Sequence, residues 1–141
     1  MDVLVSSAGG IATIALDRPA KKNAITAPMY QAMADALRAA DAEGAVRCIV
    51  IHGTSEAFTA GNDLEDFLKH PPQDESAPVF RFMAAIAGCT KPLVAAVAGP
   101  AVGVGTTMLL HCDLVYAGDN ARFALPFSQL ALCPQLASSL L

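Results

Sequence analysis

The pattern of hydrophobic and polar positions predicts several short strands. Two apolar runs, 3–7 and 11–16, flank Ala8, Gly9 and Gly10, an arrangement typical of a β-hairpin. Unbroken apolar runs at 48–51 and 93–98 have the length of strands and predict strands that are covered on both faces. Two further apolar segments, 112–118 and 122–125, predict two more strands on either side of a turn at Asp119 and Asn120.

Apolar residues recur at helical spacing between these strands. In the first helix they are Met29, Met33, Leu37 and Ala40, and in a later helix from 78 onward they are Phe80, Met83, Ala84 and Ala87. Thr26 is expected to cap the first helix and Gly44 to end it. Asp63 is placed to cap a short helix over 64–69, and a polar, proline-rich loop follows at 70–75. This alternation of strands and helices predicts an α/β layered fold.

The segment 91–118 holds a glycine-rich corner between a strand and a helix over 106–111. Gly103 and Gly105 leave the backbone around Val104 open to close approach by another backbone or a ligand. Unpaired N–H groups at the start of a helix suit a phosphate or the oxyanion of a reacting carbonyl. A dinucleotide fingerprint is disfavoured because Met108 stands where the third small residue belongs, and a P-loop lacks its lysine. A plain tight turn is the remaining alternative.

Composition narrows the class of protein. With 141 residues the chain is one domain, 1–141, and its 54% hydrophobic and 16% charged residues predict a large core and surface hidden in an assembly. A net charge of -4 argues against nucleic acid as a partner. No apolar run has the length of a membrane span, and the first ten residues lack the basic flank and long apolar region expected of a signal peptide. The four dispersed cysteines predict reduced thiols, which favours a cytoplasmic location or a mitochondrial or peroxisomal matrix.

Four segments in order resemble one known family. They are LDRPAKKNAIT at 16–26, AFTAGNDLEDF at 57–67, GPAVGVGTT at 99–107 and FALPFSQLALCP at 123–134. Together they resemble the crotonase family of enoyl-CoA hydratases and isomerases, most closely its Δ3,Δ2-enoyl-CoA isomerase branch. The resemblance implies a crotonase-like spiral of ββα units, of which this chain is the N-terminal core portion without the C-terminal helices. It also implies an acyl-CoA substrate, with coenzyme A as part of the substrate and no permanently bound cofactor, and a homo-oligomer, trimer or hexamer.

The same resemblance assigns roles to individual residues. The backbone N–H groups of Ala60 and Val104 would bind the thioester oxygen as it becomes an enolate. The residues expected along the CoA portion and at the mouth of the acyl pocket are Gly61, Asn62, Asp63 and Leu64. Lys21 and Lys22 are candidates for the CoA phosphates, with solvated lysines as the alternative, and Ala24 would lie near the pantetheine.

Gln135 occupies the position where the resembled isomerases carry their catalytic glutamate. An amide is not basic in the useful pH range, so this position as it stands lacks a general base. Thr107 and Phe127 match the two glutamates of hydratases, which argues against hydration. Asp113 and His111 are expected to be structural.

The sequence therefore predicts an isomerase-like protein and leaves alternatives open. One is a non-catalytic acyl-CoA-binding or assembly subunit that keeps the fold without the base. Others are a different enzyme of the same family, such as an enoyl-CoA hydratase, and an inactive fragment. Glu65 and Asp66 are expected to be solvated, although either could face the ligand.

Overall fold

The computed structural model describes residues 2–141. The strands are β1 (Val3–Ala8), β2 (Ile11–Leu16), β3 (Cys48–His52), β4 (Leu93–Val97), β5 (Pro100–Val102), β6 (Leu114–Ala117) and β7 (Arg122–Ala124). The α-helices are α1 (Ala27–Ala42), α2 (Leu64–Lys69), α3 (Pro78–Ala87) and α4 (Val104–Thr107). Three 3-10 turns complete the chain: η1 (Pro19–Lys21), η2 (Met108–His111) and η3 (Ser128–Leu130). The elements confirm the predicted α/β class, and within the described residues no helix is both long and apolar enough to cross a bilayer.

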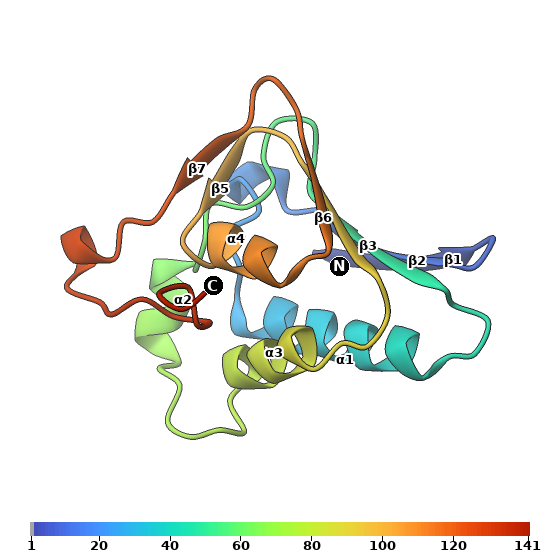
Figure 1. Ribbon diagram of the computed structural model, residues 1–141. Coiled ribbons are helices and arrows are strands. Elements are labelled where there is room, and N and C mark those ends of the chain that lie inside the picture. The colour runs from blue at the N-terminus through green and yellow to red at the C-terminus, as the bar shows by residue number, and fades with distance from the viewer. Residues whose placement is uncertain (1) are drawn as a thin grey trace.

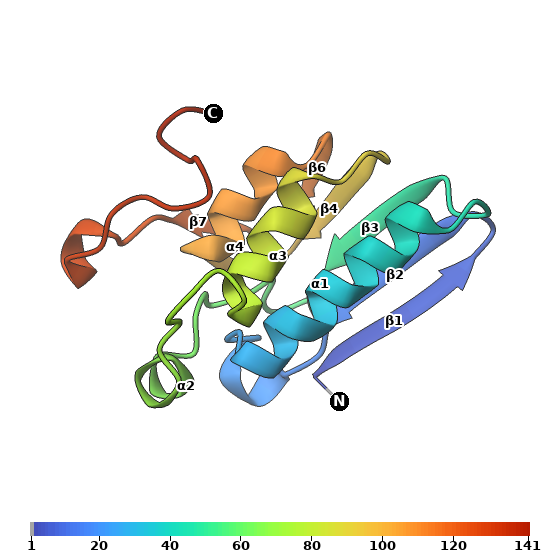
Figure 2. The ribbon, with the colours of Figure 1, turned by 90° about the horizontal axis from the view of Figure 1, so that it is seen from below.

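A five-stranded sheet, in the order β1-β2-β3-β4-β6, forms the larger layer. The first pair is the predicted antiparallel hairpin and the other three pairings are parallel. Helices α1 and α3 lie side by side across one face (Figures 1 and 2). The pairings of Ile14 with Ile51 and of Ile51 with Ala95 place three fully buried side chains in one row beneath these helices. The core therefore lies between this face and the helix pair.

The opposite face of the sheet is only partly covered. In β4, Leu93, Ala95 and Val97 are buried while Ala96 is exposed, and β3 alternates in the same way. The prediction that these strands are covered on both faces is therefore wrong, since the helices lie on one face alone. Short apolar runs are ambiguous in this respect, because alanine and valine occur on half-exposed strands as well as in buried ones.

The buried face of α3 also differs from the prediction. Phe82 and Ile86 are buried, whereas Phe80 is 40% exposed and Ala84 and Ala87 are exposed. Phe82 packs on Tyr30 of α1, with ring centroids 5.5 Å apart. The pattern predicted the wrong buried face because α3 is apolar on two sides. One side packs against the core, and the other lines a cavity with Phe80 and Met83.

The start of α1 is capped by a distant residue. Thr26 occupies the N-cap position, but its side chain accepts no hydrogen bond from the helix. The Asp66 carboxylate of α2 accepts a hydrogen bond from the Ala27 N–H at 2.7 Å instead. The predicted capping by Thr26 is therefore wrong, because a tertiary contact supplies the acceptor that the first turn needs.

A second, smaller sheet carries the loops of the candidate site. Strand β5 pairs with β7 in parallel, and its Ala101 bridges to Thr59. A further bridge joins Ile25 to Asn62. Four chain segments that are far apart in the sequence thus lie side by side at the carboxyl end of β4, where Gly99 turns the chain into β5.

Substituting Gly99 with alanine is expected to destabilise the protein by about 2 kcal/mol. Its φ of +64° disfavours any side chain, and an added Cβ would lie 1.9 Å from the Glu56 carbonyl oxygen. Urea denaturation measures the free energy of unfolding. Gly44→Ala is the matched control, because a Cβ at Gly44 meets nothing within 4 Å, and equal stability of the two variants would contradict the expectation.

Candidate functional site

A largely apolar cavity of about 380 Å³ opens beside the second sheet. It lies between the 60–67 segment, α3, the glycine corner and the 126–135 segment. Side chains that line it include Phe67, Phe80, Met83, Phe127, Leu130 and Gln135. An apolar hollow with a few polar groups is the usual form of a small-molecule site.

The strand register brings two backbone segments together at this cavity. Thr59 and Ala101 form a parallel bridge, and Asn62 and Val104, each three residues further along its own segment, both line the cavity. The approach is close: a Cβ on Gly61 would lie 2.9 Å from the Val102 carbonyl oxygen. Glycine at position 61 is therefore required for the two segments to meet.

Two backbone N–H groups at the cavity wall are unpaired. Among residues 2–141, neither the Asn62 N–H nor the Val104 N–H has a hydrogen-bond acceptor, and both residues line the cavity. Val104 is the first residue of α4, where an N–H is free of intrahelical partners and the helix dipole is positive. Together these groups form a pair of donors for an oxygen that carries negative charge.

The donor expected at Ala60 is contradicted by this hydrogen-bond pattern. The Ala60 N–H donates to the Lys22 carbonyl at 2.9 Å and is therefore already paired. The neighbouring Gly61 N–H is also paired, to the Thr59 hydroxyl at 3.0 Å. The free donor of this loop is Asn62, two residues beyond the predicted position.

A buried polar network holds the loop in place, and its central residue was not predicted. Asn23 is fully buried, and its Nδ2 donates to the carbonyls of Ala57 and Phe58 at 2.9 and 3.1 Å. The Thr59 hydroxyl donates in turn to the Asn23 carbonyl at 2.6 Å. An asparagine within the polar segment KKNA gives no sequence signal of burial, because asparagines in such segments are mostly exposed.

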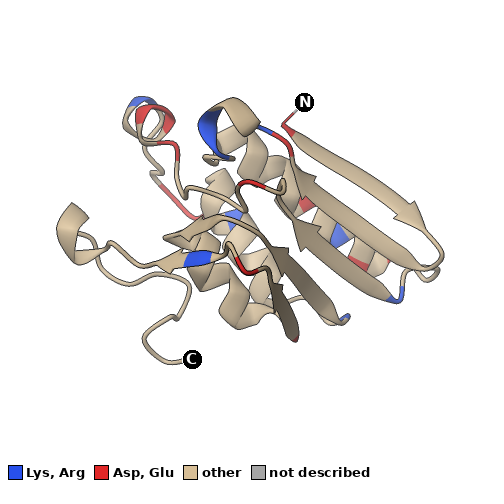
Figure 3. Cartoon of the chain, turned by 90° about the horizontal axis from the view of Figure 1, so that it is seen from above, with Lys and Arg blue, Asp and Glu red and all other residues tan. Residues whose placement is uncertain are grey.

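Asp63 joins the loop to the start of the chain. Its Oδ1 accepts from the Asp66 N–H at 3.1 Å, which confirms the predicted N-cap. Its Oδ2 accepts from Arg18 Nη1 at 2.7 Å. This hydrogen bond from Arg18, together with the cap, lowers the pKa of Asp63 below its usual value. Acidic residues gather on α2 and the loop that follows it (Figure 3).

Replacing Asp63 with asparagine is expected to lower the free energy of unfolding by about 1 kcal/mol at neutral pH. Because the pKa of Asp63 is depressed in the folded state, its stabilisation is present above the unfolded pKa of about 3.9 and is lost as the pH falls through the folded value. The stability difference between the two proteins should therefore vanish in acid. Denaturation at several pH values measures it, with the exposed Asp17→Asn as the control; a pH-independent difference would contradict the assignment.

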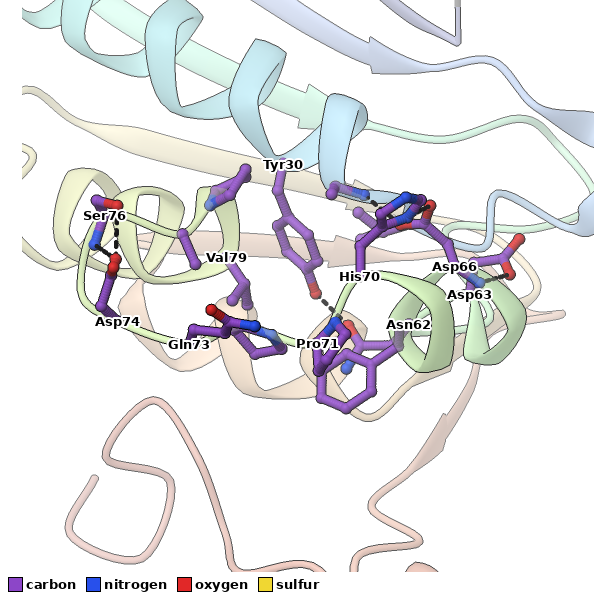
Figure 4. Close-up of a pocket in the computed structure, with 16 residues that line it drawn as sticks. Tyr30, Asn62, Asp63, Asp66, His70, Pro71, Gln73, Asp74, Ser76 and Val79 are labelled. Carbon is purple, nitrogen blue, oxygen red and sulfur yellow. Dashed lines mark hydrogen bonds and ion pairs between the residues drawn. The ribbon is translucent and has the colours of Figure 1, made fainter.

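A second cavity of about 290 Å³ adjoins the first, between α1, α2, α3 and the 70–77 connection. Asn62 lines both cavities. Tyr30 reaches down from α1, and its hydroxyl donates to Asn62 Oδ1 in the wall between them (Figure 4). Burial raises the pKa of Tyr30, so the phenol stays protonated and remains a donor.

The remaining predicted binding residues are distributed around the cavity mouth. Gly61 and Leu64 line the cavity, and Leu64 is 57% exposed. Lys21 and Lys22 are exposed and lie outside the cavity lining. Ala24 is half-buried, and its carbonyl accepts from Arg18 Nη1 at 2.8 Å. The roles of these residues in binding CoA therefore stay a prediction.

Gln135 lines the cavity. The Gln135 side chain has no hydrogen-bond partner among the described residues. No Asp, Glu or His of residues 2–141 lines this cavity. Asp113 accepts from the Leu93 N–H at 2.7 Å, and His111 Nε2 lies 2.8 Å from the Leu136 carbonyl oxygen, so both have structural contacts. Cys133 is the one titratable side chain among the described residues that line the cavity.

The chain is similar to known proteins over nearly its whole length. A family model described as enoyl-CoA hydratase/isomerase matches residues 6–140. The peroxisomal enoyl-CoA delta isomerase 3 of Mus musculus is 40% identical over 98% of this chain and 45% of its own length. The enoyl-CoA delta isomerase 2 of Rattus norvegicus is 42% identical over 97% of this chain and 36% of its own length.

A solved structure extends the comparison to the fold. The structure of Pseudomonas aeruginosa OdaA is 51% identical, with a TM-score of 0.96 over 99% of this chain and 57% of that protein. The chain thus spans less than half the length of the two curated relatives and somewhat more than half of this structure. The chain belongs to the enoyl-CoA hydratase/isomerase family and has the crotonase fold, with enoyl-CoA delta isomerases among its relatives.

Proposed function

We propose that this protein binds enoyl-CoA thioesters and that its site is built to move a double bond from position 3 to position 2. The observation that carries the proposal is the pair of unpaired N–H groups of Asn62 and Val104 at the wall of an apolar cavity. The delta isomerases among its relatives support this reaction.

The two donors fit the charge that this reaction develops. A base removes a proton from C2 of the 3-enoyl thioester, and the electron pair moves onto the thioester oxygen to form a dienolate. Hydrogen bonds from Asn62 and Val104 stabilise that oxygen. Return of the proton to C4 completes the shift of the double bond to C2–C3. The cavity lined by Phe80, Met83 and Leu130 then holds the apolar acyl chain.

The CoA portion is proposed to lie outside the cavity, along the exposed side of the AGNDL loop. The exposed Lys21 and Lys22 would attract its phosphates, and Ala24 would lie near the pantetheine. Coenzyme A enters as part of the substrate. We also propose a homo-oligomeric assembly, trimer or hexamer, in keeping with the partly open sheet face.

The group that should carry the proton is Gln135, which faces the cavity but cannot act as a base. The test is conversion of a 3-enoyl-CoA to its conjugated 2-enoyl isomer by a Gln135→Glu variant, followed by ultraviolet absorbance. The same observation favours a second function, binding of acyl-CoA without turnover. Calorimetry showing acyl-CoA binding by a variant that stays inactive would favour this second function.

A further inference from the structure

Asn62 is held in two different ways. Its backbone is fixed by its neighbours, because the Gly61 carbonyl accepts from the Ile25 N–H at 2.8 Å and the Asp63 N–H donates to the Ile25 carbonyl at 2.9 Å. Its side chain has one hydrogen-bond partner among residues 2–141, the Tyr30 hydroxyl. Oδ1 of Asn62 therefore depends on Tyr30 alone.

An asparagine side-chain oxygen without a partner can accept a hydrogen bond from a nearby backbone N–H and so compete with a ligand for that N–H. Such side chains readily accept from their own or neighbouring N–H groups in turns. Among residues 2–141, the unpaired N–H groups in this part of the chain include that of Asn62 itself and that of Leu64, two residues further on at the start of α2. Capture of the Asn62 N–H would remove a donor from the cavity.

We propose that Tyr30 is a positioning residue for the thioester oxygen site: by binding Asn62 Oδ1 it keeps the Asn62 N–H free to donate into the cavity. This inference rests on the proposed function. Tyr30 acts through Asn62 and has no contact with the reacting atoms, since it lines the neighbouring cavity (Figure 4).

Tyr30 is suited to this role by its own packing. Only 4% of it is exposed, and its ring lies at 46° to that of Phe82 in α3. The Tyr30 ring therefore has little freedom to move with the AGNDL loop. The packing of α1 on α3 sets the place of the hydroxyl, and the hydroxyl sets the place of the Asn62 side chain.

The test is Tyr30→Phe, which keeps the ring and removes only the hydroxyl. Bound crotonyl-CoA with a ¹³C-labelled thioester carbonyl is observed by isotope-edited infrared difference spectroscopy, because hydrogen bonds to a carbonyl lower its stretching frequency. The wild-type protein should shift this band downward. Tyr30→Phe should lose about half of the shift, since one of two donors is lost, and bind crotonyl-CoA about fivefold more weakly.

Matched variants separate positioning from stability. The chain has two tyrosines, and Tyr116→Phe on the exposed strand β6 should leave the band unchanged. Tyr30→Phe combined with Asn62→Ala should recover the shift, because the backbone N–H remains while the competing Oδ1 is gone. A residue needed only for packing would show no such recovery.

The outcomes distinguish the two ideas. A wild-type protein that does not bind crotonyl-CoA, or binds it without a band shift, overturns the proposed function and this inference with it. A shift that Tyr30→Phe retains in full overturns the inference alone. Failure of Asn62→Ala to restore a shift lost in a folded Tyr30→Phe also overturns it.

Discussion

Gln135→Glu is expected to raise the rate of 3-enoyl-CoA isomerisation by about 10²–10⁴-fold, the usual contribution of a positioned general base. Gln135 lines the cavity that also holds the Asn62 and Val104 donors, and its side chain has no partner among residues 2–141 that the substitution would break. The two side chains have nearly the same shape. The variant therefore changes the chemistry at this position with little change in packing.

The control for this substitution lies on the same segment. Gln129→Glu, in the exposed turn η3, adds the same charge outside the cavity lining and should leave the rate at the wild-type level. A Gln135→Glu variant that folds and binds the thioester but turns over no faster than Gln129→Glu would refute the isomerase proposal. Equal gains in both variants would indicate a nonspecific effect of charge.

Much of the fold could be predicted because its signals are local. The turn residues between β1 and β2, the helical repeat of α1 and the Asp63 cap each depend on a few neighbouring residues. The corner at Gly103 was also predictable, because glycine favours a tight turn before a helix, and Gly103 has a φ of +57°.

Features that depend on tertiary contacts could not be predicted in this way. Which N–H of the AGNDL loop is free depends on pairing with the Lys22 carbonyl and the Thr59 hydroxyl, and neither contact has a sequence pattern. The burial of Asn23 and the capping of α1 by Asp66 are of the same kind. One apolar side of α3 packs in the core and the other lines the cavity. Hydrophobicity alone does not distinguish the two sides.

The donor site itself is built almost entirely from backbone, which is why side-chain identity indicates so little about it. Val104 contributes an N–H at the cavity wall while its side chain is 1% exposed in the core. Any residue except proline would supply the same N–H. The side chain matters instead at Gly61, where a Cβ would lie too close to the Val102 carbonyl oxygen for the two backbone segments to approach.

Proline at position 104 is therefore the most direct test of the donor pair. Val104→Pro, made in the Gln135→Glu background, is expected to lower the isomerisation rate by about 10²–10³-fold, as loss of one oxyanion donor does elsewhere. Val104 is the first residue of α4, a position that accepts proline, and its N–H has no acceptor among residues 2–141 whose hydrogen bond would be lost.

Val104→Ala in the same background keeps the N–H while shortening the buried side chain, so it separates the two contributions of this residue. It should lose some stability, by about 1–2 kcal/mol, and retain its rate to within a few-fold while folded. Thermal melts confirm folding at the assay temperature, and the rate is followed with a 3-enoyl-CoA. If the proline and alanine variants were equally active, the Val104 N–H would not bind the thioester oxygen, and the site would have to stabilise the enolate from Asn62 alone.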